Sequence, residues 1–459
     1  MRRIIEAAAF GLMVGTAAVG ASAAGLRAGV AKVDITPPTG QPMWGYFDRK
    51  NPSQGTLDPL FARVLVLEAG DPDRSGEAVR LALVALDLGR TFGPPEIAQL
   101  RERAKATSNI SYVLVAASHT HAGPVILDEY QSGQTPAWES ADLEKISKAI
   151  QEAASHLVPA RLGTGYGETT IGYNRRRVNP DGTVTMFWSN PTKVPTAPVD
   201  RIVSVLRVDS EDGTPLAILV NYACHPVIFG ADNLQYSADY PGVMTQTVEK
   251  AFDGKPLCMF LQGAPGDINV YNATTPLEQD PVKFRDSVGV QLGREAARVA
   301  KTIRTEDSRD STIQFVEDTM TFHLRWDAEK LREALLAAYG PDFFKSYAPR
   351  IEPEYPLRVA TLLINQRIAV MTMPGEPFVE FQINWRDRCP TGDDFFLGYA
   401  NGYYGYFPTI QAATEGGYGA ASATTWMEVG AGERMVNHAL VRLYEMLGRL
   451  TDLPEDLKK

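Results

Sequence analysis

Short apolar runs that end at polar residues alternate along this chain with segments of helical periodicity. The runs are typical of buried strands, because they are short, rich in Val, Ile, Leu and Ala, and bounded by turn residues. The expected strands lie at 79–86, 112–117, 201–208, 216–222, 257–261 and 395–399. The expected helices lie at 94–106, 141–157, 242–252, 282–303 and 433–450. Strands that alternate with helices predict an α/β architecture.

Two further stretches indicate that the central sheet is mixed. A hairpin is expected at 359–373, with its turn at Asn365 and Gln366, and residues 311–326 are expected to run antiparallel at a sheet edge. The 459 residues contain no internal repeat and no Pro/Gly linker long enough to separate domains. We therefore predict one layered α/β/α domain with a largely mixed central sheet over residues 25–459.

The first 24 residues have the pattern of a signal peptide. Arg2 and Arg3 give a positive start, residues 7–24 carry no charge, and Ala21-Ser22-Ala23 offers small residues for cleavage. The alternative is a retained membrane anchor, although Ala and Gly are only weakly apolar and no positive stop-transfer cluster follows. No later stretch is long and apolar enough to span a bilayer. We expect an exported protein, periplasmic or secreted, of unknown oligomeric state.

The charge balance argues against a nucleic-acid partner. Lys and Arg number 45 and Asp and Glu number 55, so the formal net charge is −10. Phosphate contacts need clustered basic residues, and the sequence contains no basic block. We therefore expect no nucleic-acid partner.

Two histidine motifs follow strand-like runs. His119 and His121 form an HxH pair directly after 112–117, and in an extended segment such a pair places both imidazoles on one side of the chain. His225 follows the run at 216–222 in the same way. Taken alone, each motif is more often a set of hydrogen-bonded structural histidines than a metal site.

A carboxylate and an aromatic loop have comparable positions. Glu376 lies where a strand turns into a probable helix, and there a first-turn Glu that interacts with the helix dipole is the common structural explanation. The glycine-rich loop at 398–406 contains several tyrosines, which are often only packing residues. However, sites in open α/β sheets form outside the carboxyl ends of strands. Two imidazoles, a carboxylate and a further oxygen donor together fit a zinc site.

Several motifs occur in a recognisable order. They lie at 28–38 (AGVAKVDITPP), 119–124 (HTHAGP), 174–175, 225–226, 266–267, 374–376 (PGE) and 401–406 (NGYYGY). In this order the chain resembles the catalytic domain of the neutral/alkaline (non-lysosomal) ceramidase family. The matches run from about residue 28 to 422, which is nearly all of the chain after the expected signal peptide.

The resemblance implies one zinc ion per chain. The implied ligands are His119, His225, Glu376 and Tyr406. His121 would lie beside the zinc-bound water and pass a proton to the leaving amine. Arg175 and Tyr418 would line the reaction centre and stabilise the oxyanion that forms when the water attacks the amide. The implied reaction is hydrolysis of a linear amide, as in the conversion of an N-acylsphingosine to sphingosine and a fatty acid.

Two acidic residues have roles that the sequence leaves open. Asp87 and Asp267 both end strand-like runs. Either they orient ligand imidazoles, as carboxylates beside metal sites do, or they serve in caps and turns.

The chain departs from the family pattern in two places. Asn269 stands where the ceramidases have a Ser to which a catalytic role has been assigned. An amide side chain is no nucleophile, although it can hydrogen-bond an oxyanion, so we expect direct attack by water. In addition, only 37 residues follow Ser422, which leaves no room for the family's usual C-terminal immunoglobulin-like domain.

These departures keep three functional hypotheses open. The first is an exported zinc-dependent hydrolase of a lipid-like N-acyl amide. The second is a zinc enzyme that cleaves an ester or a lactone instead of an amide. The third is a binding relative without catalytic activity, which the retention of all four ligand types disfavours.

Overall fold

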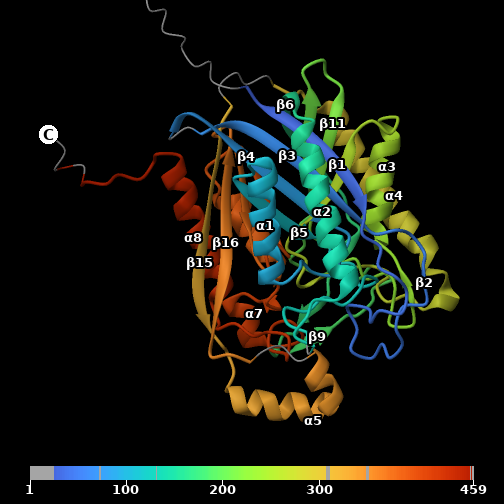
Figure 1. The fold of residues 1–459 in the computed structure, drawn as a ribbon. Helices are drawn as coiled ribbons and strands as arrows, with labels where there is room; N and C mark the ends of the chain where they lie inside the picture. The colour runs from blue at the N-terminus through green and yellow to red at the C-terminus, as the bar shows by residue number, and fades with distance from the viewer. Residues whose placement is uncertain are drawn as a thin grey trace, which may run out of the picture.

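The computed structural model describes residues 25–71, 74–130, 132–306, 311–347, 351–454 and 456, and the expected signal peptide at 1–24 lies outside them. Two sheets and the helices on their outer faces dominate the structure (Figure 1). The expected α/β class with a large mixed sheet is confirmed. Among the described residues, no helix is both long enough and apolar enough to cross a bilayer.

The larger sheet has eight strands. In spatial order they are β13 (Leu257–Gln262), β11 (Pro215–Tyr222), β10 (Ile202–Ser210), β6 (Val158–Glu168), β1 (Arg27–Asp34), β3 (Phe61–Asp71), β4 (Arg74–Leu86) and β5 (Tyr112–Ala117). The sheet is mixed, because β4–β5 and β11–β13 pair in parallel and the other neighbours pair antiparallel.

Four of the strands after residue 311 form a second large sheet. Its order is β15 (Ile313–His323), β16 (Glu354–Ile364), β17 (Ile368–Thr372) and β19 (Asp393–Leu397). The expected hairpin is confirmed as the antiparallel pair β16–β17, whose turn holds Asn365 and Gln366 at positive φ. The expected antiparallel edge is strand β15. The sequence indicated one central sheet, whereas the structure divides the strands between two.

The two sheets pack face to face and share one apolar core. Side chains at alternate positions of the larger sheet, such as Leu65, Leu114 and Leu219, pack with Leu362 and Phe395 of the smaller one. A cavity of about 40 Å³ in this core is lined only by Leu, Ile, Val and Phe. It offers no polar group, so the functional site lies elsewhere.

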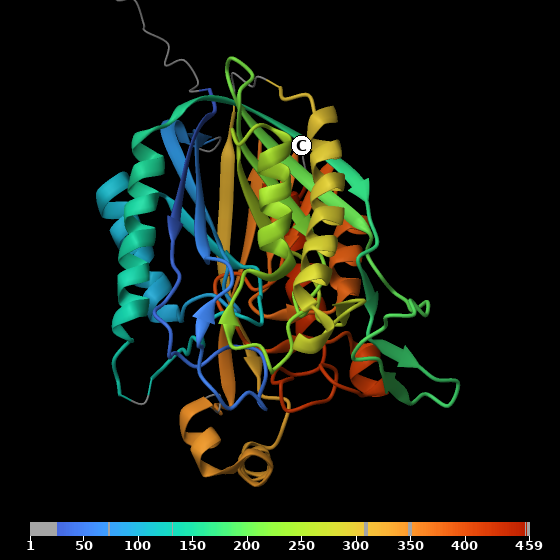
Figure 2. The same cartoon turned by 90° about the vertical axis from the view of Figure 1, so that its right-hand side faces the viewer.

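Helices cover both outer faces of this sandwich (Figure 2). Those on the larger sheet are α1 (Pro94–Ser108), α2 (Ala137–Ser155), α3 (Asp239–Ala251) and α4 (Pro281–Thr302). Those on the smaller sheet are α6 (Val379–Arg388) and α8 (Ala431–Met446). Strands β5, β11 and β13 are thus covered on both faces, which explains why they read as continuous apolar runs without polar alternation.

The helix ends follow local sequence signals. Helix α1 begins at two prolines after Gly93 and ends at Asn109, whose left-handed conformation (φ 51°) closes its last turn. Asp280 caps α4 by accepting a hydrogen bond from the backbone N–H of Lys283. The five helices expected by residue range are confirmed as α1, α2, α3, α4 and α8, with ends that differ by a few residues, whereas α5 (Ala328–Tyr347) and α7 (Ile410–Glu415) are not among the expected helices.

The parallel pairs determine where a site can form. Strands β4 and β5, β11 and β13, and β17 and β19 are parallel pairs, so the two members of each pair end at the same edge. The side chain of Gln262 at the end of β13 donates to the backbone oxygens of Ser118 and Cys224, both at 3.0 Å. This amide therefore joins the ends of β13, β5 and β11, the last two of which precede the candidate histidines.

Candidate metal centre

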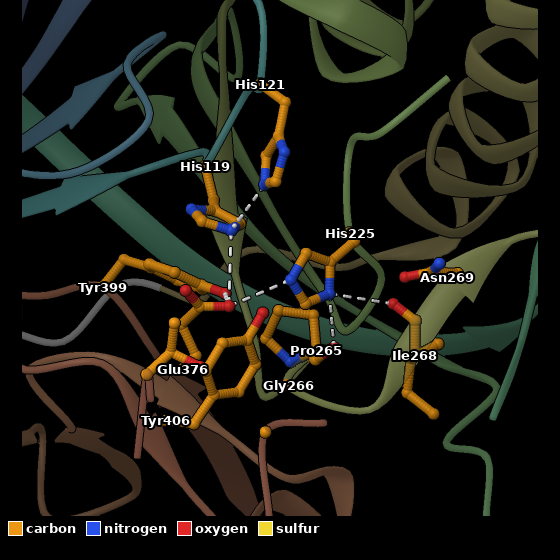
Figure 3. A network of polar contacts seen from close by, with 12 residues as sticks. His119, His121, His225, Pro265, Gly266, Ile268, Asn269, Glu376, Tyr399 and Tyr406 are labelled. Atoms are coloured by element: carbon orange, nitrogen blue, oxygen red, sulfur yellow. Dashed lines mark hydrogen bonds and ion pairs between the residues drawn. The ribbon is translucent and has the colours of Figure 1, made fainter. Parts of the chain in front are cut away.

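His119 and His121 follow β5, and their imidazoles meet. His119 has a left-handed backbone (φ 67°), which is strained for a residue with a side chain and is common at functional sites. Its Nδ1 lies 2.7 Å from the backbone oxygen of Gly89, and its Nε2 lies 3.1 Å from Nε2 of His121 (Figure 3). The HxH pair therefore shares one centre, as expected.

His225 approaches the same centre from the end of β11. Its Nδ1 lies 2.6 Å from the backbone oxygen of Pro265 and 3.1 Å from that of Ile268, and its Nε2 lies 3.1 Å from Oε2 of Glu376. The residue is fully buried. Burial is the main cause that lowers the pKa of His225 to about 4, so the imidazole is neutral at pH 7.

Glu376 is contributed by the smaller sheet. It follows β17 and opens the short strand β18 (Glu376–Pro377), which pairs with β20 (Tyr406–Phe407). Its Oε2 lies 3.5 Å from Nε2 of His119 and accepts a hydrogen bond from Tyr399 at 3.1 Å, while Tyr403 donates to Oε1. The pKa of Glu376 lies well below its usual range, because positive charge beside it, carried by the imidazoles or by a cation bound among them, outweighs the effect of burial.

The donor set fits a bound cation. The ligand nitrogens of His119, His121 and His225 lie within 4.8 Å of one another. Because a carbonyl oxygen only accepts, Nδ1 of His119 and of His225 carries the proton, and each Nε2 presents a lone pair to the centre. These lone pairs face one another and the Glu376 carboxylate, so the centre consists of acceptors that a cation would satisfy. Imidazole and carboxylate donors suit zinc.

Tyr406 points toward this centre from β20 (Figure 3). Its hydroxyl oxygen accepts a hydrogen bond from Nη2 of Arg175 at 3.0 Å, and its ring stacks with that of His225 at a centroid distance of 6.5 Å. Burial raises the pKa of the Tyr406 hydroxyl well above its usual value, so the hydroxyl stays protonated unless a cation binds.

Arg175 and Tyr418 lie beside the centre, next to Tyr406. The Arg175 guanidinium lies 5.2 Å from the ring centroid of Tyr418 and 5.5 Å from that of Tyr406. Its Nη2 also donates to the backbone oxygen of Gly266 at 2.7 Å. Nε of Arg175 is buried, and no acceptor in the described part of the chain reaches it. This nitrogen is a free donor in the reaction region.

Asn269 lies behind Arg175 rather than at the imidazoles. Its Oδ1 accepts a hydrogen bond from Nη1 of Arg175 and its Nδ2 donates to the backbone oxygen of Trp188, both at 3.3 Å. Asn269 thus holds the guanidinium and the 187–190 segment in place.

The hydrogen-bond partners of Asp87 and Asp267 favour a structural role, which is the second of the two roles that the sequence leaves open. Asp87 accepts from the Arg63 guanidinium at 2.7 Å, and Asp267 accepts from the side chain of Asn174 and from the backbone N–H of Val379 at the start of α6. Backbone oxygens orient the imidazoles instead. A backbone acceptor leaves no trace in residue types, so sequence could not identify it.

Sequence analysis missed two groups of supporting residues. Tyr399 and Tyr403 fix both oxygens of Glu376, and their only signal was the tyrosine content of the 398–406 loop. The second group is a loop before β3 that covers His121. In it, the guanidinium of Arg49 donates to the backbone oxygens of Trp44 and His121, and the ring of Tyr46 lies 5.0 Å from the His121 ring.

The fold and the centre together define an α/β protein with a buried histidine-rich site at the ends of its strands. The sequence model described as neutral/alkaline non-lysosomal ceramidase, N-terminal, matches residues 26–313. The chain therefore belongs to this family, whose members are hydrolases that act on the amide bond of ceramide. The resemblance found in the sequence motifs is confirmed.

Individual relatives support the assignment. The chain is 25% identical to the neutral ceramidase of Pseudomonas aeruginosa over 312 residues, which are 64% of this chain and 45% of that protein. It is 24% identical to the neutral ceramidase of Mycobacterium tuberculosis over 256 residues, or 52% of this chain and 37% of that protein. The chain thus spans less than half the length of each of these relatives.

The fold is shared with a solved structure. The crystal structure of neutral ceramidase from Pseudomonas aeruginosa superimposes with a TM-score of 0.72 at 19% identity, over 94% of this chain and 76% of that one. A ceramidase complexed with C2 gives the same values. At this identity the likeness establishes a common fold.

Proposed function

We propose that the protein is an exported zinc-dependent hydrolase of a linear amide with a ceramide-like, lipid-like N-acyl substrate. The convergence of His119, His121, His225 and Glu376 carries the proposal, because these side chains come from three separate strand ends and bring their nitrogen and oxygen ligand atoms together. Membership of the family supports an amide as the bond that is hydrolysed. The sequence pattern of residues 1–24 alone supports export.

His119, His225 and Glu376, with Tyr406 beside them, are the residues that would hold the zinc ion. A zinc ion in this position supplies a Lewis acid and lowers the pKa of a water molecule toward 7. His121 lies next to His119 with Nδ1 buried and without a partner in the described chain, so this imidazole is placed to accept a proton from water and to pass it on.

The remaining steps use the other side of the centre. When water adds to the amide carbonyl carbon, the carbonyl oxygen becomes an oxyanion, and Nε of Arg175 and the hydroxyl of Tyr418 are the donors that stabilise it. The C–N bond then breaks as the leaving nitrogen takes the proton from His121, which gives an amine and a carboxylic acid. Asn269 supports Arg175 and forms no covalent intermediate.

A panel of substrates with and without metal tests this function. We expect the zinc-loaded protein to hydrolyse N-acyl sphingosines, a chelator to abolish the reaction, and zinc to restore it. Hydrolysis that persists in protein shown to be metal-free would contradict the mechanism.

The same panel separates the alternative of a zinc esterase or lactonase, which Asn269 at the family's Ser position keeps open. Cleavage of esters or lactones with no cleavage of N-acyl sphingosines or N-acyl amino acids would favour it. Binding of zinc and amides without any turnover would indicate a non-catalytic relative.

A further inference from the structure

A strip of apolar side chains leads toward the reaction region. We call Val184, Met186 and Trp188 the apolar strip. Strand β9 (Val184–Met186) pairs with β8 (Arg176–Val178), and side chains at alternate positions share one face of a strand. A Cβ atom built on Gly417 would lie 3.0 Å from Val184 and 3.3 Å from Met186, so the strip lies against the segment that precedes Tyr418.

Trp188 completes the strip beside the proposed oxyanion donors. Its ring lies 5.2 Å from that of Tyr418 at an interplanar angle of 70°, and 5.8 Å from the guanidinium carbon of Arg175. Yet 49% of Trp188 is exposed. An exposed indole next to a buried reactive centre is an apolar surface that water covers until something displaces it.

The backbone around Trp188 is held on both sides. The N–H of Phe187 donates to the backbone oxygen of Arg175 at 2.8 Å, and the side chain of Asn269 donates to the backbone oxygen of Trp188 at 3.3 Å. The N–H of Asn190 donates to the backbone oxygen of Tyr271 at 2.9 Å. The indole is therefore presented by an ordered segment at a fixed distance from Arg175.

We propose that the apolar strip is one wall of a binding site for the acyl chain of the amide substrate, with Trp188 at its inner end. The inference rests on the proposed function and adds the position at which the chain lies. Ligand sites are lined mainly by aromatic and apolar side chains with few polar groups that fix orientation. Here Arg175 and Tyr418 supply the polar end, and the strip extends from it toward solvent on β9, which lies beside α7 (Ile410–Glu415) in Figure 1.

Chain-length dependence tests the site. For Trp188→Ala, we expect kcat/KM to fall on the order of tenfold more for a long-chain N-acyl sphingosine than for its acetyl analogue, because only the long acyl chain reaches the strip. Trp188→Phe should keep most of the activity toward both substrates. Val441→Ala is the matched control, since Val441 is similarly exposed (48%) on α8. Equal losses for both chain lengths would overturn the proposal.

A binding measurement separates this inference from the proposed function. An N-acyl sphingosine with a dibrominated long acyl chain should quench tryptophan fluorescence of the wild type more than that of Trp188→Phe, because bromine quenches an indole only at close range. Quenching by this probe without hydrolysis of any amide would keep the binding site and contradict the function. Hydrolysis with equal quenching in both proteins would overturn the binding site and leave the function.

Discussion

At the scale of single residues, the centre consists of groups whose protons are fixed by backbone oxygens. Gly89 and Pro265 accept from the Nδ1 atoms of His119 and His225, so both imidazoles present their Nε2 lone pairs inward. The side chain of Asn269 accepts a hydrogen bond from Arg175. Residues that are neighbours in the site therefore have separable functions.

This separation predicts different metal contents for two variants. His225→Ala should lose zinc and turnover together, because it removes a buried nitrogen donor. Asn269→Ala should retain about one zinc per chain and lose turnover through a mobile Arg175, on the order of tenfold or more. Metal analysis after gel filtration, with circular dichroism to verify folding, measures both. Equal loss of metal from the two variants would show that the ligand set is wrong.

At the scale of elements, a loop and a helix each carry a testable feature. The loop before β3 places Gly45 against His121. Gly45 has φ 110°, and a Cβ atom there would lie 2.4 Å from Nδ1 of His121. Helix α2 places Glu139 in its first turn, fully buried, with the Tyr130 hydroxyl donating to its Oε2.

Gly45→Ala should displace His121 and reduce kcat on the order of tenfold while the fold persists. The matched control is Gly40→Ala in the same loop. Gly40 also has positive φ (92°), but nothing lies within 4 Å of a Cβ atom there, so the control has the backbone strain without the contact. Steady-state kinetics and thermal unfolding of both variants make the comparison. Equal activity in the two variants would mean that His121 does not need its present position.

Glu139 should make stability fall as pH rises. Burial, the largest cause, raises its pKa from 4.5 to about 7. Between these values the folded chain keeps a proton that the unfolded chain has released, so the free energy of unfolding decreases with increasing pH. Glu139→Gln removes this titration. Between pH 5 and pH 8, the free energy of unfolding of the variant should therefore rise by about 1–3 kcal/mol relative to that of the wild type.

Thermal or urea unfolding of both proteins across this pH range gives the measurement. Other buried carboxyl groups with raised pKa, such as Asp239 and Asp394, titrate in both proteins and cancel in the difference. Parallel stability profiles for the wild type and Glu139→Gln would contradict the assignment.

The elements also show how far sequence reasoning reaches. The six expected apolar runs correspond to β4, β5, β10, β11, β13 and β19, because strands buried on both faces are apolar at nearly every position. The neighbouring strands β6, β1 and β3 of the larger sheet were not predicted, because their sequences contain Gly or charged residues among the apolar ones. His119, His225 and Glu376 could be named because they follow such runs. The division into two sheets could not be predicted, since a buried strand has the same apolar composition in either sheet. The partners of Asp87 could not be predicted either, because an Asp that follows a strand looks the same in the sequence whether its carboxylate faces an arginine or a histidine.

At the scale of the whole molecule, the shared core joins the two sheets. Leu362 of β16 is 1% exposed and packs among residues of both sheets. Leu362→Ala should lower the free energy of unfolding by about 2–5 kcal/mol, the usual cost of truncating a buried leucine. Leu450→Ala, where half of the side chain is exposed, serves as the control.

If residues 25–459 fold as one unit, this loss should appear in a single transition. Calorimetry, far-UV circular dichroism and release of bound metal should then give the same lowered midpoint for Leu362→Ala. Two separate transitions, only one of which shifts, would show that the sheets unfold independently.

The positions of the proposed metal ligands in the fold have a consequence for how substitutions in the core would act. Two imidazoles are attached to one sheet and the carboxylate to the other. A bound ion would therefore act as a cross-link between the two sheets. Any displacement of one sheet relative to the other would weaken the binding of the ion. Substitutions in the apolar core between the sheets, far from any reacting atom, would then reduce the affinity for the ion even where the protein stays folded.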